Sequence, residues 1–266
     1  MRSNNVLGFI FAATLDDKIP ELASSRTTAS VPIGGKYRII DFDLSNMSNS
    51  GISNVGIVAK SNFQSLMDHV GSGSAYDLSK RRSNLSILPP YDGKAFSSFV
   101  ETIYNMHGYI EHCREEYVLI SQGNVITNID YTDVFDFHSK KKADITLIYK
   151  NHAIPQGYDR PITLDVDNDG KVNQIFVKPG VVDKGVFNHA YGSILIKKDL
   201  LMSEIRNAIS VNQLDVRRLI QSSLGKYSIY AYENKGYCAA ISSINDYFEF
   251  NMDLMKKEVR DELFNP

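Results

Sequence analysis

Short, continuously apolar segments alternate with amphipathic segments along this chain of 266 residues. Continuous apolar runs are typical of strands that are covered on both faces. Strands are predicted at residues 6–13, 55–60, 117–121, 143–150, 193–196 and 227–232. Because helical segments separate these strands, the pattern favours a mostly parallel, three-layer α/β fold.

The intervening segments indicate where one helix ends and where another begins. Residues 63–70 carry apolar side chains at helical spacing, and Gly71 follows as a C-terminal stop. Ser98 and Glu101 have the spacing of a capping box, in which the serine hydroxyl caps the first turn of a helix.

Two further features complete the outline of the chain. The polar residues 165–171 predict a turn between two short strands. Asp246 is the predicted N-cap of one C-terminal helix that continues through residue 259.

Composition excludes several classes of protein. A net charge of -2 and a pI near 6.3 give no electrostatic reason to expect nucleic acid or an anionic membrane surface as a partner. Two cysteines, Cys113 and Cys238, make neither a disulfide framework nor a zinc set, which favours a cytoplasmic location. No signal peptide is recognisable, and no apolar run approaches the length of a membrane span.

The segment after the first predicted strand is unusual for a nucleotide-binding α/β protein. Such a protein needs glycines there, so that backbone N–H groups can surround phosphate groups. This chain has Ala13, Thr14, Leu15, Asp16, Asp17 and Lys18 instead. The Cβ atoms of these residues would narrow the space through which a phosphate group approaches the backbone, and the two aspartate carboxylates would repel a polyphosphate. Neither a G-x-G-x-x-G motif nor a P-loop occurs elsewhere.

Several segments nonetheless resemble a known family in order along nearly the whole chain. They are VPIGGKYRIIDF at 31–42, DFDLSN at 41–46, NSGI at 49–52, YDL at 76–78, ILPPY at 87–91 and YVLIS at 117–121. On these motifs the chain resembles the glucose-1-phosphate adenylyltransferases, or ADP-glucose pyrophosphorylases. The resemblance implies a nucleotide-diphospho-sugar transferase (Rossmann-like) sandwich with a mixed, mostly parallel sheet. It also implies one nucleotidyltransferase-like domain over residues 1–266, truncated before the left-handed β-helix that full-length members carry.

The family transfers AMP from ATP to glucose 1-phosphate with Mg²⁺, and this chain departs from it at the positions that bind phosphate and metal. The family's glycine-rich loop aligns with residues 13–18, where Lys18 replaces an arginine. Its two metal-binding aspartates align with Asn124 and Ala240. Because Mg²⁺ prefers carboxylate ligands, we expect no metal site and no catalytic residues here.

Other nucleotide-binding positions are degenerate as well. Ala12, Ala13 and Gly123 occupy the aligned nucleotide-binding positions, without the glycines of the loop. A family Lys-Pro becomes Thr28-Ala29, and a Gly-Thr-Ala becomes residues 98–100, where larger side chains would crowd a pocket for the base. Five independent changes at phosphate or metal positions argue against simple drift.

Some family cations are retained. Lys178 aligns with a lysine for the sugar phosphate, and Gly192 matches another substrate-binding position. Lys36 and Arg38 lie where the family places residues that sense effectors. An equally weighted alternative for Arg38 is a structural ion pair with Asp41 or Asp43.

These departures favour a D-type regulatory subunit of ADP-glucose pyrophosphorylase, catalytically deficient and without a metal cofactor of its own. The resemblance implies a hetero-oligomer with the catalytic subunit, with a sugar phosphate or anionic effector as a possible ligand. Two alternatives remain open at this point. One is an active adenylyltransferase with altered metal ligands, and the other is a sensor that binds a nucleotide or sugar phosphate without turnover.

Overall fold

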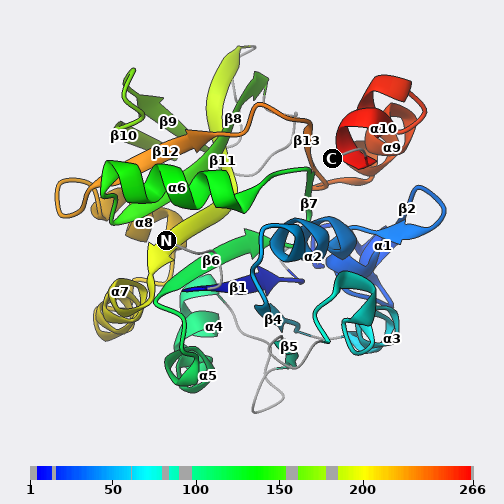
Figure 1. Ribbon diagram of the computed structural model, residues 1–266, viewed down its shortest axis with the longest axis horizontal. Helices are drawn as coiled ribbons and strands as arrows, with labels where there is room; N and C mark the ends of the chain where they lie inside the picture. The colour runs from blue at the N-terminus through cyan, green and yellow to red at the C-terminus, as the bar shows by residue number, and fades with distance from the viewer. Residues whose placement is uncertain are drawn as a thin grey trace. The chain divides into compact units, whose positions relative to one another are not determined.

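The computed structural model describes residues 5–13, 16–60, 62–79, 84–89, 98–153, 161–177 and 185–264 (Figure 1). The chain forms two compact units, each assembled from separate segments. Unit 1 contains Met1–Leu7, Pro90–Ile120 and Thr132–Glu233. Unit 2 contains Gly8–Pro89, Ser121–Tyr131 and Asn234–Pro266.

Unit 1 is built on a mixed sheet around one long strand, β11 (Val186–Lys197). β11 pairs antiparallel with β6, β8 and β9. β9 and β10 form an antiparallel hairpin, and β12 runs parallel to β8. The strands are β6 (Tyr117–Gln122), β8 (Ile145–Ala153), β9 (Ile162–Val166), β10 (Val172–Val177) and β12 (Ile229–Glu233).

Two helices of unit 1 begin at a capping side chain. Ser98 caps α4 (Phe99–Asn105) by accepting the backbone N–H of Glu101, as its spacing predicts. Asp215 caps α8 (Val216–Ser222) in the same way through Arg217. The other helices are α5 (His107–His112), α6 (Tyr131–Lys141) and α7 (Lys198–Ser210).

From Gly8 onward, β1 (Val6–Phe11) belongs to unit 2, and the strand is buried along its whole length as a continuous apolar run predicts. The strand order there is β1, β4 (Asn54–Val58), β5 (Asn84–Leu88), and β4 runs parallel to β5. Two small antiparallel sheets pair β2 (Pro32–Ile33) with β3 (Tyr37–Arg38) and β7 (Val125–Thr127) with β13 (Cys238–Ala240). Three helices come early in the unit: α1 (Pro20–Ala23), α2 (Ile40–Asn49) and α3 (Gln64–Val70).

The predicted α/β class with a mixed sheet is confirmed, as is the turn at residues 165–171. In that turn, Asp167 Oδ1 accepts the backbone N–H groups of Asp169 and Lys171, each at 2.9 Å. The turn therefore forms because the aspartate side chain satisfies two backbone donors locally. The predicted stop of α3 at Gly71 is also confirmed, since Gly71 has φ of 54°.

The prediction of a single C-terminal helix capped by Asp246 is wrong. There are two helices, α9 (Ile244–Asp253) and α10 (Lys257–Phe264). The N-cap of α9 is Ser243, whose hydroxyl accepts the N–H of Asp246 at 3.1 Å. The Asp246 carboxylate accepts the N–H of Ser242, the residue before the N-cap, at 2.9 Å, so Asp246 holds the chain that leads into the helix and does not cap it.

One apolar cluster joins distant segments of unit 2. It includes Ile33 and Phe42 from the early part of the chain and Phe250 and Leu263 from α9 and α10. Burial of such side chains contributes roughly 1.5–3 kcal/mol each. Within the described part of the chain, no helix is long and apolar enough to cross a membrane.

Candidate functional site

The loop after β1 begins with two buried alanines in unit 2. Ala12 and Ala13 are 0% and 5% exposed. The Ala12 N–H donates to the carbonyl of Val58 at 2.9 Å, and the Ala12 carbonyl accepts the N–H of Ala29 at 3.0 Å. A phosphate-binding loop needs backbone N–H groups that face the ligand. The Ala12 N–H is instead used within the protein.

Asp16 closes this loop onto Thr28. Its Oδ1 accepts the Thr28 N–H at 2.8 Å and the Thr28 hydroxyl at 2.7 Å. Burial raises the pKa of the Asp16 carboxyl, and the bonds from Thr28 together with the nearby charge of Lys60 oppose that rise. A carboxylate of the chain thus takes two donors that a ligand oxyanion would need. Lys18, further along the loop, is exposed.

Gly123 lies where three segments meet. Its N–H donates to the Phe11 carbonyl at 2.9 Å. A Cβ at this position would lie 2.8 Å from the Phe11 carbonyl oxygen, 3.0 Å from the Ala29 Cβ and 3.1 Å from the Ala12 Cα. Glycine is therefore required for packing. The structure brings positions 12, 29 and 123 together, and the space beside Gly123 is filled by protein atoms.

We expect Gly123→Ala to lower the free energy of unfolding by about 2 kcal/mol, because the new Cβ overlaps rigid backbone atoms. Urea unfolding followed by circular dichroism measures this change. Gly108→Ala is the matched control, since a Cβ at Gly108 would meet nothing within 4 Å. Equal stability of the two variants would contradict the packing described here.

Asn124 directly precedes β7, and Ala240 is the last residue of β13, the strand that pairs with β7. β7 and β13 pair so that Ala240 lies opposite Val125. The Asn124 carbonyl accepts the N–H of Ile241 at 2.8 Å, and its side-chain Nδ2 donates to the Ile241 carbonyl at 3.2 Å. Asn124 is 3% exposed. Asn124 is therefore opposite Ile241, and positions 124 and 240 are diagonal neighbours across this pairing.

The donor atoms at this place do not fit Mg²⁺. Hard divalent cations require several oxygen ligands, with carboxylates providing the charge. Asn124 has a neutral amide, whose nitrogen is already hydrogen-bonded, and Ala240 has a methyl group. Among the described residues, no group of three or more acidic, histidine or cysteine side chains could hold a metal ion.

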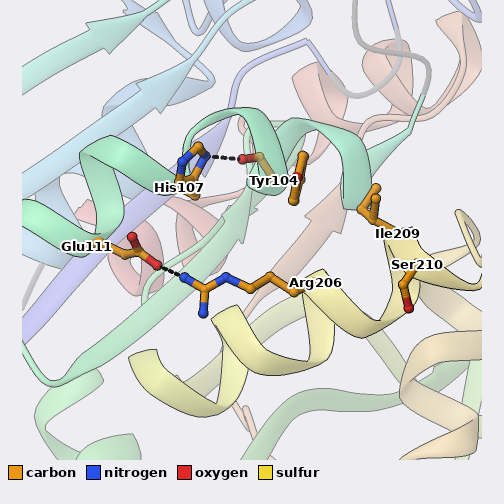
Figure 2. Close-up of a pocket in the computed structure, with 6 residues that line it drawn as sticks. All are labelled: Tyr104, His107, Glu111, Arg206, Ile209 and Ser210. Carbon is orange, nitrogen blue, oxygen red and sulfur yellow. Dashed lines mark hydrogen bonds and ion pairs between the residues drawn. The ribbon is translucent and has the colours of Figure 1, made fainter.

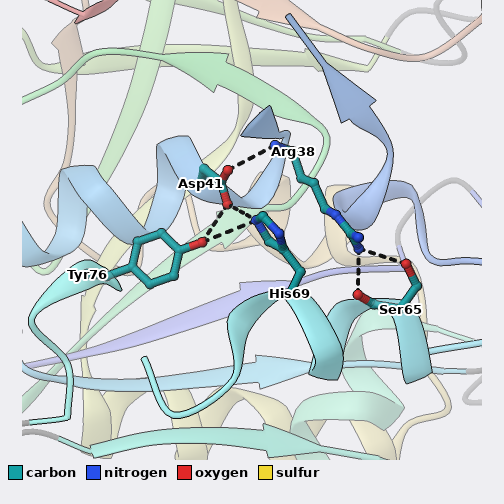
Figure 3. A network of polar contacts seen from close by, with 5 residues as sticks. All are labelled: Arg38, Asp41, Ser65, His69 and Tyr76. Carbon is teal, nitrogen blue, oxygen red and sulfur yellow. Dashed lines mark hydrogen bonds and ion pairs between the residues drawn. The ribbon is translucent and has the colours of Figure 1, made fainter. Parts of the chain in front are cut away.

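The hairpin of β2 and β3 carries the two candidate effector residues. It turns at Gly34 and Gly35, which have φ of 57° and 75°. The Lys36 Nζ lies 5.7 Å from the centroid of the Tyr37 ring. The Arg38 guanidinium donates to the Ser65 hydroxyl at 2.7 Å and to the Ser65 carbonyl (Figure 3). Arg38 is thus held by α3, and not by the ion pair with Asp41 or Asp43 weighed from the sequence.

Asp41 is the centre of a polar network that sequence reasoning missed (Figure 3). Its Oδ2 accepts the backbone N–H of Arg38 at 2.9 Å. Its Oδ1 lies 2.6 Å from both the Tyr76 hydroxyl and His69 Nε2. Burial and the neighbouring carboxylate raise the pKa of Tyr76, so the phenol keeps its proton and donates it. The network ties the start of α2 to α3 and to the segment after it.

A second carboxyl of α2 is buried. Asp43 is 3% exposed, its Oδ1 accepts the Ser121 hydroxyl at 2.5 Å, and its Oδ2 has no partner among the described residues. Burial raises the pKa of Asp43 to about 7. Asp43 in turn contributes to the raised pKa of the buried Tyr131. No spacing in the sequence distinguishes Asp43 from an exposed helical aspartate.

The two remaining candidates are the substrate-binding positions Gly192 and Lys178. Gly192 lies in β11 of unit 1 with φ of 96°, where the register with β8 shifts between Ala190 and Ile194. The positive φ explains why glycine suits this irregular point of the strand. Lys178 lies outside the described residues.

Comparison with known proteins decides which family this geometry belongs to. Residues 17–256 match the family model for nucleotidyl transferases. A glucose-1-phosphate adenylyltransferase from Clostridium acetobutylicum is 30% identical over 100% of this chain and 71% of its own length. The chain belongs to the glucose-1-phosphate adenylyltransferase family. The adenylyltransferases of Clostridium perfringens and Bacillus subtilis are 32% and 30% identical, over 99% and 97% of this chain and 69% of each relative.

A solved structure shows the same fold. It comes from Bacillus anthracis and is described as a glucose-1-phosphate thymidylyltransferase in complex with sucrose. It superposes with a TM-score of 0.76 over 98% of both chains, at 12% sequence identity. The resemblance inferred from the sequence motifs is therefore confirmed, both for the adenylyltransferase family and for its fold.

Proposed function

We propose that this chain is a catalytically deficient, regulatory subunit of an ADP-glucose pyrophosphorylase in glycogen biosynthesis. The observation that carries the proposal is the pair of neighbours Asn124 and Ala240. If two carboxylates anchor the metal in active members, then an amide and a methyl group at these places leave the ion without charged ligands. A metal–triphosphate complex would then lack the two carboxylates that hold its metal ion.

The loop after β1 supports the same proposal independently. Transfer of a nucleotidyl group needs donors and cations that neutralise the phosphates as charge develops. Here the Asp16 carboxylate takes the Thr28 N–H and hydroxyl, and atoms of Phe11 and Ala29 fill the space beside Gly123. An incoming triphosphate would meet a negative charge in place of free N–H groups.

We propose that the catalytic subunit of the enzyme is the partner of this chain in a hetero-oligomer. The chain would then tune activity or the response to an anionic effector. Lys36 is available for such a role because it is exposed, whereas Arg38 would first have to leave Ser65. Lys178 is the candidate for holding a sugar phosphate.

Turnover by the purified chain tests the proposal. With ATP, glucose 1-phosphate and Mg²⁺, we expect pyrophosphate release at least about a thousandfold slower than by a catalytic relative, because metal stabilisation is worth several kcal/mol. Expression in a host without its own adenylyltransferase removes contaminating activity. Sustained turnover by this chain alone would instead support the active-enzyme alternative.

Co-purification tests the regulatory part. Co-expressed with its catalytic paralogue, the chain should elute with it and change its rate or its response to an anionic effector. Lys36→Ala should weaken the effector response and leave the complex intact. A chain that neither catalyses the reaction nor associates with the catalytic paralogue would refute the regulatory proposal. Binding of glucose 1-phosphate by such a chain, measured by calorimetry, would instead identify a sensor without turnover.

A further inference from the structure

A surface cavity in unit 1 belongs to none of the positions described above. It has a volume of 530 Å³ and lies among α4, α5 and α7 (Figure 2). The volume is within the range of small-molecule sites. Six side chains line it: Tyr104, His107, Glu111, Arg206, Ile209 and Ser210.

One wall of the cavity is aromatic. The rings of Tyr104 and His107 are stacked, with centroids 5.8 Å apart and an angle of 30° between planes. Tyr104 is 39% exposed, which is high for a large aromatic side chain. His107 Nδ1 lies 2.7 Å from the Tyr104 carbonyl oxygen, so Nδ1 carries the proton. In the neutral ring, Nε2 then remains a hydrogen-bond acceptor.

The charges of the cavity cancel. The Arg206 guanidinium forms an ion pair with the Glu111 carboxylate across the space between α5 and α7 (Figure 2). A paired arginine offers little attraction for a phosphate group. Both side chains are well exposed, at 56% and 39%, and a guanidinium and a carboxylate each retain further hydrogen-bonding positions.

The polar side of the cavity therefore carries both hydrogen-bond donors and hydrogen-bond acceptors. The Ser210 hydroxyl donates to the Asn207 carbonyl at 2.8 Å, which leaves its lone pairs as acceptors. Arg206 supplies donors, and Glu111 supplies acceptors. A ligand that matches this set has groups that both donate and accept, together with an apolar face for the aromatic wall and for Ile209.

We propose that this cavity binds a neutral saccharide. A pyranose ring has C–H groups that can pack on the Tyr104 face, because the negative face of an aromatic ring attracts their positive edges. Its hydroxyl groups donate to Glu111 and Ser210 and accept from Arg206. Because the cavity is open to solvent, it can hold one or two sugar residues while the rest of an oligosaccharide extends outward. The site is separate from the degenerate nucleotide loop and does not depend on the proposed regulatory function.

Saccharide binding is measured with the full chain by saturation-transfer NMR and calorimetry, using maltotriose, cellotriose and sucrose as separate probes. We expect saturable, weak binding of at least one neutral probe, and the preferred probe identifies the linkage. Inorganic phosphate should not displace it. Displacement by phosphate would assign the cavity to anions, and absence of binding by all three saccharides would remove the proposal.

Variants connect the binding to this cavity. Tyr104→Ala should weaken saccharide binding roughly tenfold, whereas Tyr104→Phe, which keeps the ring, should retain most of it. Phe248→Ala is the control, because Phe248 is an aromatic side chain in unit 2 that is 61% exposed. Thermal unfolding by circular dichroism verifies that each variant is folded. Unchanged affinity in a folded Tyr104→Ala variant would place the ligand elsewhere.

Discussion

Asp43→Asn is expected to raise the free energy of unfolding at pH 8 and to flatten its dependence on pH. In the folded chain, burial raises the pKa of Asp43 from 3.8 to about 7. Between these two values the folded state holds a proton that the unfolded state has released. Stability contributed by protonated Asp43 is therefore fully present below pH 4 and is lost as the pH rises through about 7.

The size of the effect follows from the difference between the two pKa values. One pKa unit corresponds to about 1.4 kcal/mol, so ionisation of Asp43 costs roughly 4 kcal/mol above pH 7. The amide of the variant can still bond to Ser121 but carries no charge. Urea unfolding at pH 5 and pH 8 should show the wild-type chain losing stability and the variant losing much less.

Asp136→Asn is a suitable control for this experiment, because Asp136 is an exposed residue of α6. This control should keep the wild-type dependence on pH. A wild-type chain whose stability does not fall between pH 5 and pH 8 would show that Asp43 is already ionised in the fold. An Asp43→Asn variant with the wild-type slope would assign the titration to another group.

The double variant Asn124→Asp and Ala240→Asp is expected to create a divalent-cation site. β13 pairs with β7 so that Ala240 is opposite Val125, which makes position 240 a diagonal neighbour of position 124, and the family resemblance assigns the carboxylates of these two positions to one ion. Without metal, their mutual repulsion in a partly buried place should lower the melting temperature. At a hundredfold excess over its dissociation constant, a bound ion restores about 2.7 kcal/mol.

Calorimetry with Mn²⁺, supported by melting curves with and without the ion, measures this gain of function. Each single variant is the control and should bind Mn²⁺ at least about tenfold more weakly, because it has only one of the two carboxylates. Stabilisation of the double variant no greater than that of the singles would contradict the alignment of positions 124 and 240. Under the proposed function, the double variant should still not catalyse nucleotidyl transfer, since Asp16 occupies the Thr28 donors.

The parts of the fold that could be predicted from the sequence are those governed by local chemistry. The Ser98 cap and the Asp167 turn depend on side chains that satisfy backbone groups only a few residues away. The long buried strands were recognisable because their apolar runs are continuous. The small strands β7 and β13 have three residues each, too few for any periodic signal, although they bring Asn124 and Ala240 together.

The contacts of the candidate site depended on tertiary structure. Asp16 and Thr28 are 12 residues apart, and Asp41 and Tyr76 are 35 apart, with no pattern that links them. The sequence showed that residues 12–18 contain no glycine, but not that the Asp16 carboxylate accepts the N–H and hydroxyl of Thr28. Arg38 illustrates the same limit, since nearby aspartates suggested an ion pair and the fold supplied Ser65 instead.

The assembly of unit 2 from three separate segments has a consequence for synthesis of the protein. Phe42 and Ile33 leave the ribosome early, yet they pack against Phe250 and Leu263 from the last two helices described. Until those helices emerge, the apolar side chains that they cover remain exposed on the nascent chain. Growing copies of this unit should therefore be clients of ribosome-associated chaperones until α9 and α10 have emerged.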